Sequence, residues 1–169
     1  LALTDVSLPN GLKSLGFASF GSCIALEEIA LPSSVISIGR SAFAECAALK
    51  SIVIPEGVTC IDNYTFNGCT ALTSITIDAT TPPTLGSNVF YNTNDCPIYV
   101  PCESVEAYKS ASGWSTYASR IACPPFEGKF KATYSGGETY ELDCDGNTTL
   151  STGNTKPAGY EYSAMTEAI

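Results

Sequence analysis

Histidine is absent from the 169 residues of the chain. Its absence removes the Ser-His-Asp and Cys-His nucleophile systems, the usual general base near neutral pH and the commonest zinc ligand. Basic residues are also scarce, because 8 Lys and Arg stand against 17 Asp and Glu, a net charge of −9. A surface of that sign repels phosphate backbones and anionic lipid. We therefore expect no nucleic-acid partner, no cofactor and no enzymatic activity.

Long apolar runs are missing as well. Hydrophobic residues make up 44% of the chain, but no run approaches the roughly 18 residues that a membrane span needs. The length leaves room for one compact domain, or for one domain with an appendage. We expect no membrane insertion by this chain.

What the chain does contain is a short repeat with a constant period, and a period between about 20 and about 50 residues indicates a solenoid or a related array. Cys23, Cys46 and Cys69 lie one period apart. The same step separates the members of further ladders: Pro9, Pro32 and Pro55; Phe20, Phe43 and Phe66; Leu3, Leu26, Leu49 and Leu72; Val6, Ile29, Ile52 and Ile75; Leu15, Ile38 and Ile61. We call each 23-residue unit a coil.

The second coil shows how one unit folds. Ile29 and Leu31 alternate as on a half-buried strand, and Pro32 ends that strand because it has no N–H. The residues around Ile38 return along the opposite side, and the segment from Ala42 to Cys46 suits one short helical or 3₁₀ turn. One coil cannot bury its own apolar edge, so neighbouring coils stack. This predicts a solenoid of four to five coils over residues 1–101, with Phe and Cys in columns.

The pattern changes after the third coil. Pro82-Pro83 interrupts the fourth coil, but Ile98 lies one full period after Ile75 and predicts a fifth strand. Helical spacing predicts a short helix and a second turn in an α-helical cap over residues 102–125. For residues 126–169 alternation predicts a small antiparallel β meander, at about 128–152. Because Met165-Thr166-Glu167-Ala168 resembles the start of a coil, this segment is alternatively an insert between two arrays.

The combination of Ile-Pro with Ala-Phe-x-x-Cys at this period resembles the BspA-like leucine-rich-repeat family of bacterial surface proteins. The resemblance covers residues 3–101, and residues 98–115 resemble the terminal cap common in the family. It implies a secreted or surface-attached, non-catalytic protein that adheres to a host matrix protein or a bacterial surface protein.

The positions of the cysteines and of two acidic residues bear on metal binding and on disulfide formation. The Cys23, Cys46 and Cys69 ladder is better explained by buried thiols than by metal ligands, since the chain has no Cys-x-x-Cys pair. A bridge between Cys102 and Cys123 would suit an exported protein, and the sequence does not decide the states of Cys96 and Cys144. The stretch from Asp143 to Asn147 is explained by an Asp-Gly turn rather than a calcium loop. We predict no metal site.

The outward positions of the strands form the candidate partner-binding surface, which we call the strand face. Its residues are Thr4, Asp5, Ser7, Glu27, Glu28, Ala30, Lys50, Ser51, Val53, Thr73, Ser74, Thr76 and Tyr99. Only Tyr99 among them is aromatic, which favours a protein ligand over a glycan, and the acids favour a basic partner. Two alternatives remain open at this point: a glycan-binding accessory module and a structural spacer.

Overall fold

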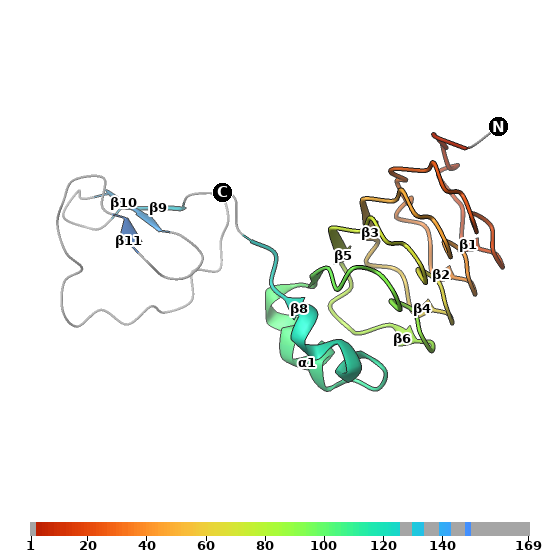
Figure 1. Cartoon of the computed structure of the whole chain (residues 1–169). Coiled ribbons are helices and arrows are strands. Elements are labelled where there is room, and N and C mark those ends of the chain that lie inside the picture. Colours follow the sequence, from red (N-terminus) through yellow and green to blue (C-terminus); the bar gives the residue numbers. More distant parts are fainter. Residues whose placement is uncertain (1–2, 126–129, 134–138, 143–147, 150–169) are drawn as a thin grey trace. The chain divides into compact units, whose positions relative to one another are not determined.

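The computed structural model describes residues 3–125, 130–133, 139–142 and 148–149 (Figure 1). The chain divides into two compact units, Leu1–Pro124 and Pro125–Ile169. The first unit contains the repeat and the segment expected to cap it. Each unit is considered by itself below.

Two parallel sheets run along the sides of the repeat unit (Figure 1). The first sheet has the strands β1 (Ser14–Leu15), β2 (Ser37–Ile38), β4 (Cys60–Ile61) and β6 (Thr84–Leu85), in that order. Leu15, Ile38 and Ile61 are paired in register and point into the core. These strands occupy the return side of each coil, where the sequence predicted only a crossing chain.

The second sheet carries the strand face. Its order is β3 (Ser51–Ile54), β5 (Ser74–Ile77), β7 (Ile98–Tyr99) and β8 (Ile121–Ala122). The expected strand around Ile29 and Leu31 is not formed as a strand, although Ile29 is buried. Glu and Ala, which occupy its outward positions, have low β propensity. The second coil still joins the sheet side through a bond from the Lys50 N–H to the Glu27 carbonyl oxygen, at 2.9 Å.

The third side of each coil is a series of turns, and the helical or 3₁₀ turn predicted there is wrong. In the second coil, bonds from Ala42 to Gly39, from Ala44 to Ser41 and from Cys46 to Phe43 close three consecutive turns. Ser41 and Glu45 have φ angles of 56° and 61°. These two left-handed residues interrupt a right-handed helix twice within the three turns. We call residues 16–23, 39–46, 62–69 and 86–93 the turn side.

Backbone hydrogen bonds join the turn sides of neighbouring coils. The N–H groups of Ser41, Phe43 and Glu45 donate to the carbonyl oxygens of the third coil's Asn63, Thr65 and Asn67, at 3.0, 2.9 and 2.7 Å. The same set of three bonds joins the first coil to the second and the third to the fourth. The coils are therefore held together by backbone bonds on all three sides.

The core between the sheets is a column of stacked rings. Phe20, Phe43, Phe66 and Phe90 stack with successive centroid distances of 5.4, 5.4 and 5.9 Å, close to parallel. The ladder cysteines lie beside them, and the Cys69 thiol donates to the Phe43 carbonyl oxygen at 3.1 Å. Phe90 enters the column although its spacing from Phe66 is one residue longer than the repeat.

The cap follows the path of one more coil. It consists of η1 (Cys102–Ser104), α1 (Val105–Ser110) and η2 (Trp114–Arg120), and it ends in β8. Ile121 pairs with Ile98, which lies one period earlier, so the register of the sheet continues through the cap. Trp114 extends the ring column at 5.9 Å from Phe90, and Tyr108 packs edge-on against Trp114. Both cap aromatics are buried, as expected for cap core.

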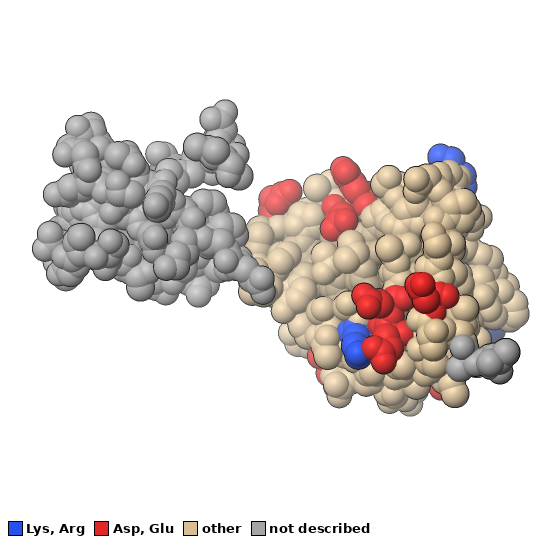
Figure 2. Space-filling model, turned by 90° about the horizontal axis from the view of Figure 1, so that it is seen from above, with Lys and Arg blue, Asp and Glu red and all other residues tan. Residues whose placement is uncertain are grey.

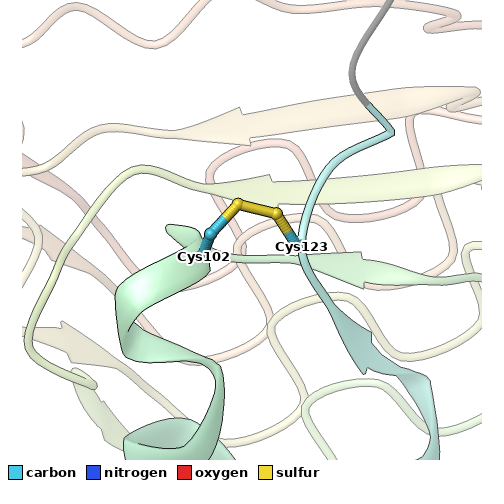
Figure 3. The surroundings of a disulfide bond; sticks show 2 residues. All are labelled: Cys102 and Cys123. Carbon is cyan, nitrogen blue, oxygen red and sulfur yellow. A yellow bond between two sulfur atoms is a disulfide. The ribbon is translucent and has the colours of Figure 1, made fainter. Parts of the chain in front are cut away.

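Polar contacts fix the cap to the fourth coil, and a disulfide closes the cap on itself. The Arg120 side chain is nearly buried and donates to the Cys96 carbonyl oxygen at 2.8 Å and to the Thr93 hydroxyl at 2.9 Å. The Cys102–Cys123 bridge that the sequence left open is formed, with a Cα–Cα distance of 4.6 Å (Figure 3). It ties the start of η1 to the residue after β8.

The second unit contains three short strands. They are β9 (Phe130–Thr133), β10 (Thr139–Leu142) and β11 (Thr148–Thr149), and they pair antiparallel in the order β11-β10-β9. The turns expected between the strands lie outside the described residues. So do Cys144, the Asp-Gly turn that was weighed against calcium, and the coil-like segment at Met165.

Candidate interaction surface

The structure places the strand-face residues on the outside of one side of the stack. Ten of them are exposed: Thr4, Asp5, Ser7, Glu27, Glu28, Ala30, Lys50, Ser51, Val53 and Thr73. Ser74, Thr76 and Tyr99 are partly covered by their neighbours. The alternation that predicted these positions is therefore reproduced in the burial of the side chains.

Strand pairing sets these side chains in columns. Val53 pairs with Thr76, Thr76 with Tyr99, and Tyr99 with Ala122. Neighbouring strands are about 4.8 Å apart, so the column is a regular row across four strands. Val53 is the most apolar member, and 51% of its surface is exposed. Such a face can contact a partner without any change in the core.

The charges of the strand face are arranged unevenly. Lys50 forms an ion pair with Glu27 of the preceding coil, and this contact raises the pKa of the Lys50 ammonium group. The pair reduces the negative charge at the centre of the face, which the sequence did not reveal. Asp5 and Glu28 make no ion pair within the described residues. Among the charged side chains visible in Figure 2, acidic ones outnumber basic ones.

Most of the free thiols among the described residues are buried, and the described residues contain no cluster of metal ligands. Cys46, Cys69 and Cys96 are buried, whereas Cys23 and Cys60 are half-buried. A hydrogen bond with Cys46 and burial raise the pKa of the Cys69 thiol, and burial raises those of Cys23 and Cys96. Among the described residues no three His, Cys, Asp or Glu side chains come together as metal ligands. In the same part of the chain no helix has the length and apolar character to cross a membrane.

Sequence reasoning missed a set of exposed aromatic residues on the turn side. Phe17 and Tyr91 are 74% and 64% exposed, and the guanidinium of Arg40 lies 5.6 Å from the ring centroid of Tyr64. These residues lie outside the outward positions of the strands, where the alternation of apolar residues gives no signal for them. Comparing the positions that flank the Phe ladder from coil to coil would have found them.

The sequence matches the family model described as "BspA type Leucine rich repeat region", with six copies over residues 1–111. The match covers more than half of the chain, so the chain belongs to this family of leucine-rich-repeat proteins. Repeats of this class generally serve as protein-interaction modules.

Two solved structures of bacterial leucine-rich-repeat proteins are similar to this chain. A protein of T. pallidum matches with a TM-score of 0.51 and 25% identity, over 58% of this chain and 45% of that chain. A protein of Bacteroides ovatus matches with a TM-score of 0.47 and 31% identity, over 55% of this chain and 24% of that one. The chain thus spans less than half the length of either protein. No curated protein matches it.

Proposed function

We propose that this chain is a non-catalytic, secreted or cell-surface binding module that mediates adhesion by holding a protein partner on its strand face. The observation that carries the proposal is the in-register row from the exposed Val53 through Thr76 to Tyr99, both half-buried, above a core that those side chains do not enter. A host matrix protein or a bacterial surface protein is the partner class we propose.

The charges of the face indicate the chemistry of that partner. Glu27 is paired with Lys50, so Asp5 and Glu28 supply the charge to which a basic partner responds. Complementary charges accelerate association and make it sensitive to salt. A standard interface uses about 20–30 residues on each side, more than this strand face offers. The chain alone should therefore bind weakly, with a Kd of about 1 µM or higher.

The proposed location outside the cytoplasm rests on two supports. Membership of the BspA-type family favours it. The Cys102–Cys123 disulfide also favours it, because such bonds persist in oxidising compartments and are rare in the cytosol.

Surface-based binding of the purified chain to a panel of host matrix proteins tests the function. Glu28→Lys should weaken binding about tenfold at low salt, because it reverses an exposed charge of the strand face. Glu56→Lys is the matched control: it makes the same exposed charge change beyond the end of β3, outside the strand face, and should have little effect. A loss of binding with Glu56→Lys but not with Glu28→Lys would place the interface elsewhere. Finding no binder in the panel would contradict a host matrix protein as the partner.

A further inference from the structure

Tyr64 and Tyr91 lie on the turn sides of two adjacent coils, the third and the fourth. Tyr91 is 64% exposed, and Tyr64 is half-buried. The backbone connects them, since the Asn67 N–H donates to the Tyr64 carbonyl oxygen at 3.2 Å and the adjacent Gly68 N–H donates to the Tyr91 carbonyl oxygen at 3.0 Å. The turn side here presents aromatic rings that the packing of the core does not use.

Tyr64 occupies a conformation that tyrosine rarely adopts. Its φ angle is 59°, and the equivalent positions of the other coils hold Ala18, Ser41 and Asn88, all with positive φ. A bulky side chain in the left-handed region is an outlier, whereas Asn is enriched there. Such local strain often accompanies a functional role. The fold therefore needs a left-handed residue at this position, but it does not need a tyrosine.

The groups around Tyr64 orient its ring and surround it with polar atoms. The Arg40 guanidinium lies over the ring at 5.6 Å from the centroid and restricts its orientation. Asn67 and Asn88 supply amide groups on the same turns, and Asn88 is exposed. Glu45 of the second coil also lies on the turn side, and its charge is opposite to that of Arg40.

We propose that the turn-side surface formed by Tyr64 and Tyr91, with Arg40, Asn67 and Asn88, binds a neutral polysaccharide. The C–H face of a sugar ring stacks on an aromatic ring, and side-chain amides donate to and accept from sugar hydroxyls. The exposed Tyr91 ring and the half-buried Tyr64 ring belong to adjacent coils, which suits a ligand that extends over several sugars. This surface is separate from the strand face and does not depend on the function proposed for it.

Salt dependence separates this surface from the strand face. Binding to a neutral sugar through stacking and amide hydrogen bonds has no long-range charge term, so it should change little between about 0.05 M and about 0.5 M NaCl. A protein that docks through Asp5 and Glu28 should bind less tightly over the same range. A salt-sensitive interaction at the tyrosines would contradict a neutral polysaccharide as the ligand.

Affinity electrophoresis tests the proposal, in native gels containing xylan, mannan, β-glucan or galactan, with alginate as the acidic comparison. The double variant Tyr64→Asn with Tyr91→Asn tests the rings with the least disturbance of the fold. Asn already occupies the equivalent position of the adjacent coil in both cases: Asn88 corresponds to Tyr64, and Asn67 corresponds to Tyr91. It should keep the wild-type melting temperature, and its dissociation constant for the retarding neutral polysaccharide should rise about tenfold or more. Tyr99→Ser, on the strand face, is the matched control and should leave retardation unchanged.

Three results would overturn the proposal. They are the absence of retardation by every neutral polysaccharide, equal retardation of the double variant and the wild type, and loss of retardation by Tyr99→Ser alone. Retardation by alginate only would identify a charge-driven contact instead. None of these outcomes bears on matrix-protein binding, which is measured separately.

Discussion

Trp114 donates its indole N–H to the carbonyl oxygen of Pro83 at 2.8 Å, across the junction between the cap and the fourth coil. The Tyr108 hydroxyl makes a matching bond to the carbonyl oxygen of Ala79, at 2.7 Å. Both bonds are buried; one acceptor, Ala79, lies just before the segment where Pro82-Pro83 breaks the repeat, and the other is Pro83 itself. The irregular fourth coil thus presents carbonyl groups whose partners are the polar atoms of the cap aromatics, and the two segments stabilise each other.

Removing one of these bonds should destabilise the repeat unit measurably. Tyr108→Phe leaves the buried Ala79 carbonyl oxygen without its donor, at a cost of about 1–3 kcal/mol in the free energy of unfolding. Urea denaturation followed by circular dichroism measures the change. Tyr91→Phe removes a hydroxyl from an exposed ring and should change the value by less than about 0.5 kcal/mol. Equal effects of the two variants would mean that the Tyr108 bond contributes nothing.

The same tyrosine should make stability depend on alkaline pH. Burial, and then the Asp78 carboxylate, raise the pKa of Tyr108 above its ordinary value. Because the unfolded chain loses this proton first, the contribution is present below about pH 10 and is lost as the pH rises further. Stability of the wild type should therefore fall more steeply than that of Tyr108→Phe as the pH rises above about 10. Parallel curves would contradict this assignment.

The ring column should account for a large part of the stability. Phe43 is fully buried between Phe20 and Phe66, and Phe43→Ala should cost about 3–5 kcal/mol. Phe17→Ala is the matched control, since Phe17 is 74% exposed, and its cost should be under about 0.5 kcal/mol. Urea melts of both variants measure the difference. A small cost for Phe43→Ala would show that the rings do not pack as a column.

The free thiols should react in two groups. The repeat alone predicts that Cys23, Cys46 and Cys69 are equally protected, but Cys23 lies in the first described coil and is only half-buried. Iodoacetamide should therefore label Cys23 and Cys60 first, and Cys46 and Cys69 only after unfolding, because the reaction needs an accessible thiolate. Peptide mass spectrometry at timed intervals resolves the sites. Labelling of Cys46 as fast as Cys60 would contradict the burial of the column.

Glycine should be favoured at the left-handed turn positions. Ala18→Gly should stabilise the chain by about 0.5 kcal/mol, because Ala18 has a φ angle of 49°. Gly68→Ala should destabilise it by more than about 1 kcal/mol. Gly68 has a φ angle of 75°, and a Cβ there would lie 2.5 Å from a Glu45 carboxylate oxygen.

Gly57→Ala is the control for the turn positions, since a Cβ at Gly57 would meet its nearest atom at 3.4 Å. Its effect should stay below about 0.5 kcal/mol. Thermal melts of the three variants measure the set. A stabilising Gly68→Ala would show that the turn does not require the left-handed conformation.

The parts of the fold that follow from the repeat could be read from the sequence. Ile52, Ile75 and Ile98 lie one period apart, and their spacing gives the register of the second sheet and the inward side of each strand. The same period continues to Ile121, so the fifth-coil path of the cap was readable as well. It was overlooked because helical spacing dominates residues 105–117.

Other features depend on contacts that no single ladder reveals. The turn side was predicted to be helical because Ser41 and Glu45 are not residue types typical of a left-handed backbone. The return strands are two residues long and leave almost no alternation to detect. The Lys50–Glu27 ion pair requires two coils to be placed in register before the residues meet. The spacing of residues in the repeat does not specify the ligand of either surface.

The backbone bonds of the turn side give the stack a net dipole along its axis. At each of the three junctions, three N–H groups of one coil point toward the C-terminal neighbour, and three carbonyl groups point back. Peptide dipoles aligned in this way add, as they do along an α-helix, whereas those of a sheet largely cancel. Every added coil lengthens the row of aligned dipoles. Within the described coils, the carbonyl groups of Phe17, Ser19 and Gly21 lie at the negative end of this row, and its positive end lies beside the cap.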